Sequence, residues 1–222
     1  MTQTLSARSR AVRTSPTSWS AARGLAAGAV VAGPLFLGAG IVQGLTRDGF
    51  DFSRNAISQL ALGEAGWIQT VNFLIAGALL IAGAAGLRRA LGGGVGGTWG
   101  PALTGVFGLS FWAAAAFPAD AGAGFPAGAP DTTVISGHGS VHMLAGMVGY
   151  LALCAVFVVL ARPLAARGHR GWAVASRLMP IAVLAGFMAS AASVLAFTTA
   201  AGLGLVGLAA VTARLVAVPA GR

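Results

Sequence analysis

The sequence predicts an all-α polytopic membrane protein in which six transmembrane helices form one bundle. Its 222 residues are 56% hydrophobic and only 9% charged, whereas soluble proteins carry about 25% charged residues. The mean hydropathy is +0.81. Apolar runs alternate with short polar segments, and carboxylates and arginines fall mostly in different segments. We therefore expect the lipid bilayer to surround most of the chain.

Six apolar runs are long enough to cross about 30 Å of hydrocarbon as helices. The third run is the shortest and lies between Trp99 and Pro118, while tryptophans at run ends are typical of the membrane interface. The last two runs are separated only by Thr198–Ala200, which predicts a tight helical hairpin. The expected spans are 24–45, 68–87, 101–117, 141–161, 178–197 and 201–219.

The N-terminal segment differs in composition from the rest of the chain. Residues 1–20 are rich in Ser, Thr and Arg and have no apolar periodicity, so we expect a flexible basic tail there. The membrane domain would then occupy residues 21–222. A cleaved signal peptide is the alternative, but the apolar run 24–45 is long for one.

The distribution of arginine predicts the orientation of the bundle. All 14 basic residues are Arg, and with a cytoplasmic N-terminus 12 of them lie inside and two, Arg47 and Arg54, lie outside. All five carboxylates then lie outside, and both termini are cytoplasmic. The net charge of +9 is explained by this rule, so we expect no nucleic-acid partner. The expected location is a prokaryotic cytoplasmic membrane.

Small residues recur at a spacing of four, which lets helix backbones approach closely. We expect these pairs to pack within one bundle, with a dimer face as the alternative. The pairs are Gly24 with Gly28, Ala82 with Gly86, Ala145 with Gly149, and Gly186 with Ser190.

The first outer segment has its own helical pattern. Ser53 is expected to cap a short amphipathic helix, Arg54–Leu62, that stops at Gly63. This helix either closes the bundle or presents Arg54, Ser58 and Gln59 to a polar pocket that binds a lipid or small molecule.

Two amides lie near the outer end of the second span. Gln69 and Asn72 are one helical turn apart. Polar groups at such depth face the bundle interior or a cavity. They either hydrogen-bond between helices or extend the outer pocket as ligand-binding residues.

His138 and His142 are spaced i, i+4 at the entry to the fourth span, so they share one face if helix begins by His138. Two such imidazoles can ligate zinc, although the Glu of the H-E-x-x-H motif is absent. A third ligand is required. Asp120 is the first candidate, with Asp131, Asp48 and Asp51 in reserve. The alternatives are structural hydrogen bonding and proton or ligand handling.

Several segments resemble the domain-of-unknown-function 998 family of six-helix prokaryotic membrane proteins. The resemblance covers about residues 25–215 and implies the topology, but no activity. A more distant likeness is to ceramidase-like membrane hydrolases, which place a Ser, an Asp and histidines around zinc at one membrane face. The residues here that resemble this set, without its third histidine ligand, are Ser58, Asp120, His138 and His142. The family resemblance rests on Phe52–Trp67 with its I-S-Q-L-A-L-G stretch, Asn72–Gly77, Gly86–Arg89, Phe117–Asp120 and His138–His142.

Two functional hypotheses follow. The first is a non-enzymatic membrane protein that binds a lipid or small molecule in an outer pocket or assists a membrane partner. The second is a zinc-dependent hydrolase of a lipid amide or ester. In it, His138, His142 and Asp120 would hold the metal, and Ser58 or Arg54 would stabilise the oxyanion.

Overall fold

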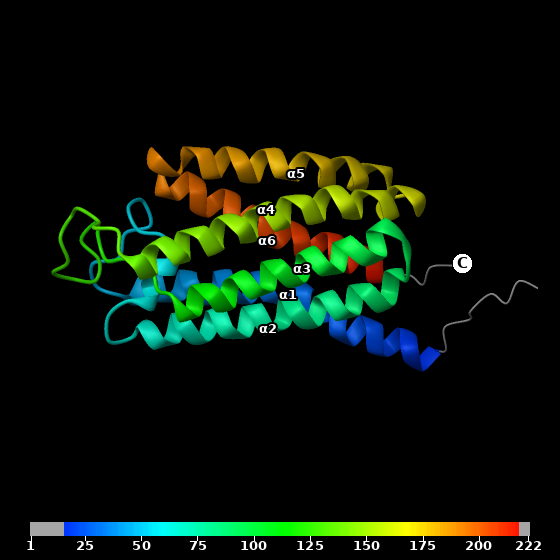
Figure 1. The fold of residues 1–222 in the computed structure, drawn as a ribbon, viewed down its shortest axis with the longest axis horizontal. Coiled ribbons are helices and arrows are strands. Elements are labelled where there is room, and N and C mark those ends of the chain that lie inside the picture. The colour runs from blue at the N-terminus through cyan, green and yellow to red at the C-terminus, as the bar shows by residue number, and fades with distance from the viewer. Residues whose placement is uncertain (1–15, 218–222) are drawn as a thin grey trace, which may run out of the picture.

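A computed structural model of the chain describes residues 16–217. Over this range the protein is helical, with six long α-helices and two short 3₁₀ helices (Figure 1). The α-helices are α1 (Pro16–Thr46), α2 (Gly66–Leu91), α3 (Gly94–Ala116), α4 (Gly137–Ala166), α5 (Arg170–Met188) and α6 (Val194–Val216), and the 3₁₀ helices are η1 (Ile57–Ala61) and η2 (Ala189–Ala191).

The six helices form one antiparallel bundle. Helices that follow one another in the chain lie side by side, and α6 also packs against α1 and so closes the bundle. The start of α1 and the end of α6 lie at the same end, opposite the two long loops (Figure 1). This return of the chain is what an even number of helices requires.

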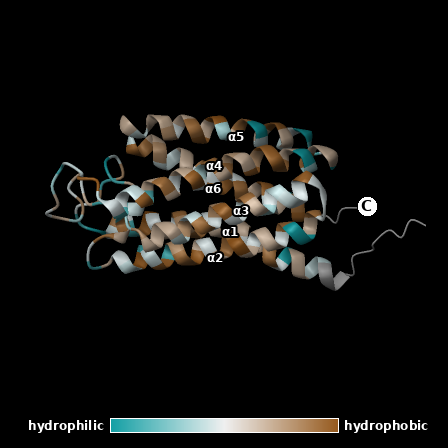
Figure 2. Ribbon diagram, viewed as in Figure 1, coloured by the Kyte–Doolittle hydropathy of each residue, from teal (hydrophilic) through white to brown (hydrophobic). Residues whose placement is uncertain are grey.

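Five of the helices are long and apolar enough to cross a membrane, and α3 is not among them. Apolar residues run along the bundle, and the hydrophilic ones gather toward its two ends (Figure 2). The predicted all-α multi-pass membrane fold is confirmed. The crossing of α3 and the side on which each end lies remain predictions.

The expected hairpin between the last two spans was wrong in position. Helix α5 ends at Met188, and the chain turns through η2, so Thr198–Ala200 lie inside α6. The hydroxyl of Ser193 caps α6 by accepting a hydrogen bond from the amide of Ala196 at 3.2 Å. Hydropathy could not find this turn, because the Ala and Ser residues that form it are as compatible with helix as their neighbours.

Helices also extend past the apolar runs at their ends. Helix α1 begins at Pro16, inside the segment expected to be a tail, and residues 1–15 of that tail lie outside the described residues. Proline suits the first turn of a helix because that turn has no partner for its N–H. Near the end of α6, Arg214 reaches the turn between α4 and α5, where its Nη2 lies 3.2 Å from Nδ1 of His169.

Small residues allow the close approach of neighbouring helices, as the spacing predicted. A Cβ on Gly28 would meet the backbone of Leu79 in α2, and one on Gly86 would meet the backbone of Ala26 in α1. Gly149 lies against the side chain of Ser110 in α3. Gly24 is different, because open space surrounds it.

Candidate functional site

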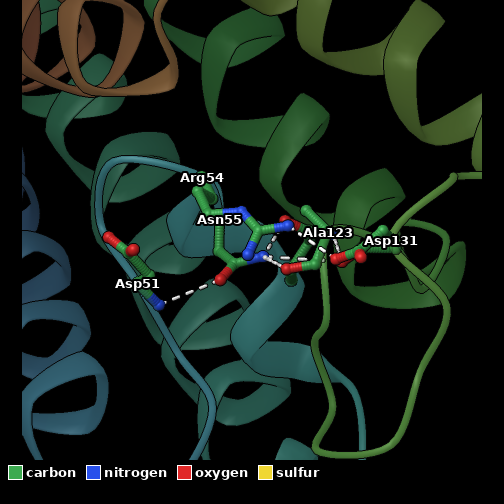
Figure 3. A network of polar contacts seen from close by, with 7 residues as sticks. Asp51, Arg54, Asn55, Ala123 and Asp131 are labelled. Carbon is green, nitrogen blue, oxygen red and sulfur yellow. Dashed lines mark hydrogen bonds and ion pairs between the residues drawn. The ribbon is translucent and has the colours of Figure 1, made fainter.

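The two long loops at one end of the bundle, residues 47–65 and 117–136, are joined by a buried asparagine (Figure 3). Oδ1 of Asn55 accepts a hydrogen bond from the amide of Asp51 at 2.9 Å. Its Nδ2 donates to the carbonyls of Gly122 at 3.5 Å and Ala123 at 3.4 Å in the second loop. The side chain is 0% exposed, and the loops therefore form one cap over the end of the bundle.

The short helix expected at Arg54–Leu62 was wrong in extent and in its cap. Helix appears only as the 3₁₀ turn Ile57–Ala61. The hydroxyl of Ser53 donates to Oδ1 of Asp51 at 2.7 Å, so it does not cap this turn. The two hydrogen bonds from Ser53 lower the pKa of the Asp51 carboxyl. The local pairing of Asp51 with Ser53 holds the chain in a turn and delays the helix.

Gln59 and Arg47 make further contacts within the cap. Oε1 of Gln59 accepts from the amide of Ala56 at 3.1 Å, and its Nε2 donates to the carbonyl of Asp120 at 3.2 Å. Arg47 donates to the carbonyls of Leu60 and Leu62, each at 2.7 Å, and lies over the buried ring of Phe125. These contacts therefore hold the Arg47 guanidinium on the inner surface of the cap.

Asp120 stabilises the start of α4. Its two carboxylate oxygens accept hydrogen bonds from the hydroxyl of Ser136 at 2.6 Å and from the amide of Ser136 at 2.9 Å. Ser136 in turn caps α4 by accepting from the amide of Gly139 at 3.0 Å. A Cβ on residue 139 would overlap the Asp120 carboxylate, so glycine is required for this approach. An anion at a helix N-terminus is favoured by the helix dipole.

The same hydrogen bonds keep Asp120 ionised. The side-chain and then the backbone hydrogen bond from Ser136 lower the pKa of its carboxyl, and the charges of His142 and His138 add to this effect. Since the charges of both histidines act on the Asp120 carboxyl, the three side chains lie near one another.

The zinc ligand set expected from His138, His142 and Asp120 is not formed by the described residues. Within residues 16–217, no three His, Cys, Asp or Glu side chains are arranged to hold a metal ion. Nδ1 of His142 lies 2.9 Å from the carbonyl of Phe117, and His138 is exposed with its ring against that of Phe117. Both histidines therefore contact Phe117, which lies in the junction between α3 and α4. The reserve ligand Asp131 pairs with Arg54 at 2.7 Å.

A cavity of about 700 Å³ lies beneath the cap. At the loop end its lining includes Ser58 and Gln59 from the first loop, Asp120 from the second, and His142 from the start of α4, and we call these four residues its mouth. Aromatic rings from all six α-helices form the rest of its wall. These are Phe36 of α1, Phe73 of α2, Phe107 and Phe111 of α3, Tyr150 of α4, Phe187 of α5, and Phe197 of α6.

One polar group in the deep part has no partner. The hydroxyl of Thr198 is buried and makes no hydrogen bond with any described residue, although Thr198 lines the cavity. The rings around it contact one another edge to face, with Tyr150 and Phe197 centroids at 5.9 Å. Beyond its mouth the cavity is therefore mainly apolar, with Ser110, Ser190 and Thr198 as polar residues among the rings.

Gln69 and Asn72, expected as ligand-binding residues, do not line this cavity. Both are buried between α1 and α2. Nε2 of Gln43 and Nδ2 of Asn72 donate to Oε1 of Gln69 at 2.7 and 3.1 Å, and Asn72 also donates to the carbonyl of Phe36. They join two helices. Arg54 does not line the cavity either, because its guanidinium is engaged with Asp131.

The aromatic wall was not found among the sequence candidates. Its rings come from six helices and are spread over Phe36–Phe197. In the sequence these residues are indistinguishable from rings that would face lipid. The one available signal was the closely spaced pair Phe107 and Phe111, four residues apart on one face of α3.

The fold and the cavity define a multi-pass helical membrane protein with a capped pocket at one end of its bundle. The family model of DUF998, described as protein of unknown function, matches residues 30–220, and the chain belongs to this family. Comparisons with curated proteins and with solved structures gave no match.

Proposed function

We propose that this protein binds a lipid-like molecule with a single apolar chain, which enters the cavity with its polar head at the loops. The change of the cavity lining from polar to aromatic along its depth carries this proposal. Ser58, Gln59 and Asp120 lie at the head end, and the phenylalanines lie at the chain end. An amphiphile has the same two-part chemistry.

The size of the cavity supports a ligand of this kind. Its volume of about 700 Å³ falls within the roughly 300–1,000 Å³ range of small-molecule pockets. A cavity of this volume suits a molecule with one apolar chain better than a two-chain lipid together with its headgroup. An apolar space left empty would also cost the lining side chains their dispersion contacts, so an apolar occupant would stabilise the bundle.

The arginine distribution supports an extracytoplasmic mouth. The cap carries all five carboxylates of the chain, and the opposite end carries most of its arginines. Under the positive-inside rule the cap faces away from the cytoplasm. The ligand would therefore enter from the outer side.

The zinc hydrolase is not favoured, because its three ligands are engaged elsewhere. Asp120 accepts from Ser136, and His142 is bonded to the carbonyl of Phe117. Ser58 and Asp120, the predicted catalytic residues, are instead assigned to contacts with the head.

The test uses a tetradecyl alcohol that carries a photoreactive diazirine in its chain. We expect irradiation to label the aromatic wall, for example the peptides containing Phe111 or Phe197, as mapped by mass spectrometry. Gly146 also lines the cavity, and open space surrounds its Cα. The substitution Gly146→Trp should therefore fill the cavity and abolish this labelling.

The matched control is Gly38→Trp. Gly38 is also helical and surrounded by open space, but it does not line the cavity. This variant should be labelled like the natural protein. Wall labelling that survives in Gly146→Trp, or that is absent from the natural protein, would contradict the proposal.

A further inference from the structure

Given the proposed amphiphile site, we infer that its mouth selects heads that donate hydrogen bonds and are neutral or positively charged, and that it rejects anionic heads. The ligand class would then be long-chain alcohols and amines, and not fatty acids or phospholipids. The inference rests on the charges and hydrogen-bonding groups that surround the mouth.

No cation of the described chain lines the cavity. The lining contains Asp120 and His142 but no arginine of residues 16–217, and the sequence has no lysine. An anionic head would therefore lie near a carboxylate with no fixed positive charge to pair with it. Like charges placed together in this way are strongly disfavoured.

The two arginines of the cap are held away from the mouth. Arg47 is bonded to the carbonyls of Leu60 and Leu62, and it lies over the ring of Phe125. Arg54 forms an ion pair with Asp131. Neither guanidinium lines the cavity, so neither is placed to receive an anionic head.

Two groups at the mouth, His142 and Asp120, are acceptors, whereas the Ser58 hydroxyl can donate or accept and the Gln59 amide N–H already donates to the carbonyls of Asp120 and Gly122. The carbonyl of Phe117 can only accept, so the hydrogen on the His142 ring lies on Nδ1, which is 2.9 Å away. In the neutral ring Nε2 is then an acceptor. Asp120 is ionised and also accepts, since each carboxylate oxygen has lone pairs beyond those used by Ser136. A hydroxyl or an ammonium group supplies the donors that these acceptors need.

The experiment compares three photoreactive probes that share one tetradecyl chain and carry a hydroxyl, a primary ammonium or a sulfate head. Cavity labelling is measured in vesicles of neutral lipid at neutral pH. We expect labelling by the ammonium and hydroxyl probes and little by the sulfate probe. An exposed charge pair is worth up to a factor of about five, so the ammonium probe should exceed the hydroxyl probe by no more than that.

Two matched variants test whether Asp120 is the carboxylate that favours the ammonium head. Asp120→Asn keeps an oxygen that can accept from Ser136 but removes the charge, so the ammonium probe should fall to the level of the hydroxyl probe. Glu64→Gln, which removes an exposed carboxylate of the same cap that does not line the cavity, should change nothing. A third variant, Ser58→Arg, leaves Asp120 in place and adds a cation at the mouth. This variant should admit the sulfate probe.

The outcomes separate the two proposals. If the sulfate probe labels the wall as strongly as the ammonium probe, the head selectivity is wrong and the amphiphile site stands. An ammonium preference that is unchanged in Asp120→Asn overturns it as well. If none of the three probes labels the wall, the proposed function itself fails, and this inference fails with it.

Discussion

Asn55 is the residue on which the outer cap most depends. Its single amide group bonds one backbone amide in the first loop and two carbonyls in the second. An amphipathic helix at this place would have put Asn55 on an exposed face. Its burial follows from the turn at Asp51, which directs the side chain toward the second loop.

The variant Asn55→Ala should destabilise the protein by about 1–3 kcal/mol, because it leaves several buried backbone groups without a partner. Thermal unfolding in mild detergent measures the loss. Hydrogen exchange at the Gly122 and Ala123 amides should also accelerate, since the loops would separate.

The control for this variant is Arg54→Gln, the neighbouring residue. It breaks an ion pair whose side chains are 51% and 80% exposed, and such pairs contribute about 0–1 kcal/mol. Equal unfolding temperatures for the two variants would show that Asn55 does not hold the loops together.

At the scale of elements, the contact between α1 and α2 depends on glycine at particular positions. Gly86 lies against the backbone of Ala22 and Ala26, and Gly28 lies against that of Leu79. Backbone atoms cannot move aside as the end of a side chain can. The close approach of the two helices also brings Gln43 and Gln69 within hydrogen-bond distance.

A comparison of two Gly→Ala substitutions tests this contact. Gly86→Ala should cost about 1–3 kcal/mol, as overpacked sites do. Gly24→Ala adds the same methyl group where open space surrounds it, and it should stabilise the helix by roughly 0.5–1 kcal/mol. Unfolding in a denaturant titration gives both values. Equal effects of the two substitutions would refute the assignment of close packing to Gly86.

At the scale of the whole molecule, the direction of the bundle and the crossing of α3 are the open predictions. Helix α3 is not among the helices that are long and apolar enough to cross a membrane, and it contains several Gly residues together with Thr98, Trp99 and Pro101. It nevertheless lies between α2 and α4, which both qualify as membrane spans. If α3 crosses, the segments before and after it lie on opposite sides.

Cysteine labelling in intact cells tests both predictions at once. The native Cys154 is buried, so it should not react. Gly93→Cys, before α3, should be protected from a membrane-impermeant maleimide, and Thr132→Cys, after α3, should be labelled. Labelling of both positions would show that α3 does not cross. Labelling of Gly93→Cys alone would reverse the orientation.

Part of the candidate site could be predicted from the sequence. Ser58, Gln59, Asp120 and His142 were singled out by their polarity and position, and all four line the cavity. Gln69 and Asn72 were singled out by the same criterion, and they pair between helices instead. Polarity identifies a side chain that needs a partner. It does not say whether that partner is another helix or a ligand.

The sequence by itself determined that this is a helical multi-pass membrane protein, because the length and hydropathy of each run are local properties that lipid selects directly. It also predicted an arginine-poor outer end, since the positive-inside rule acts on charge counts. Only the tertiary structure decided what the outer residues do. Asp120 became the stabilising anion of α4, and His142 became a neighbour of Phe117. Rings from six helices lined a cavity. These outcomes depend on contacts between residues that lie far apart in the chain, and those contacts are set by how the helices pack.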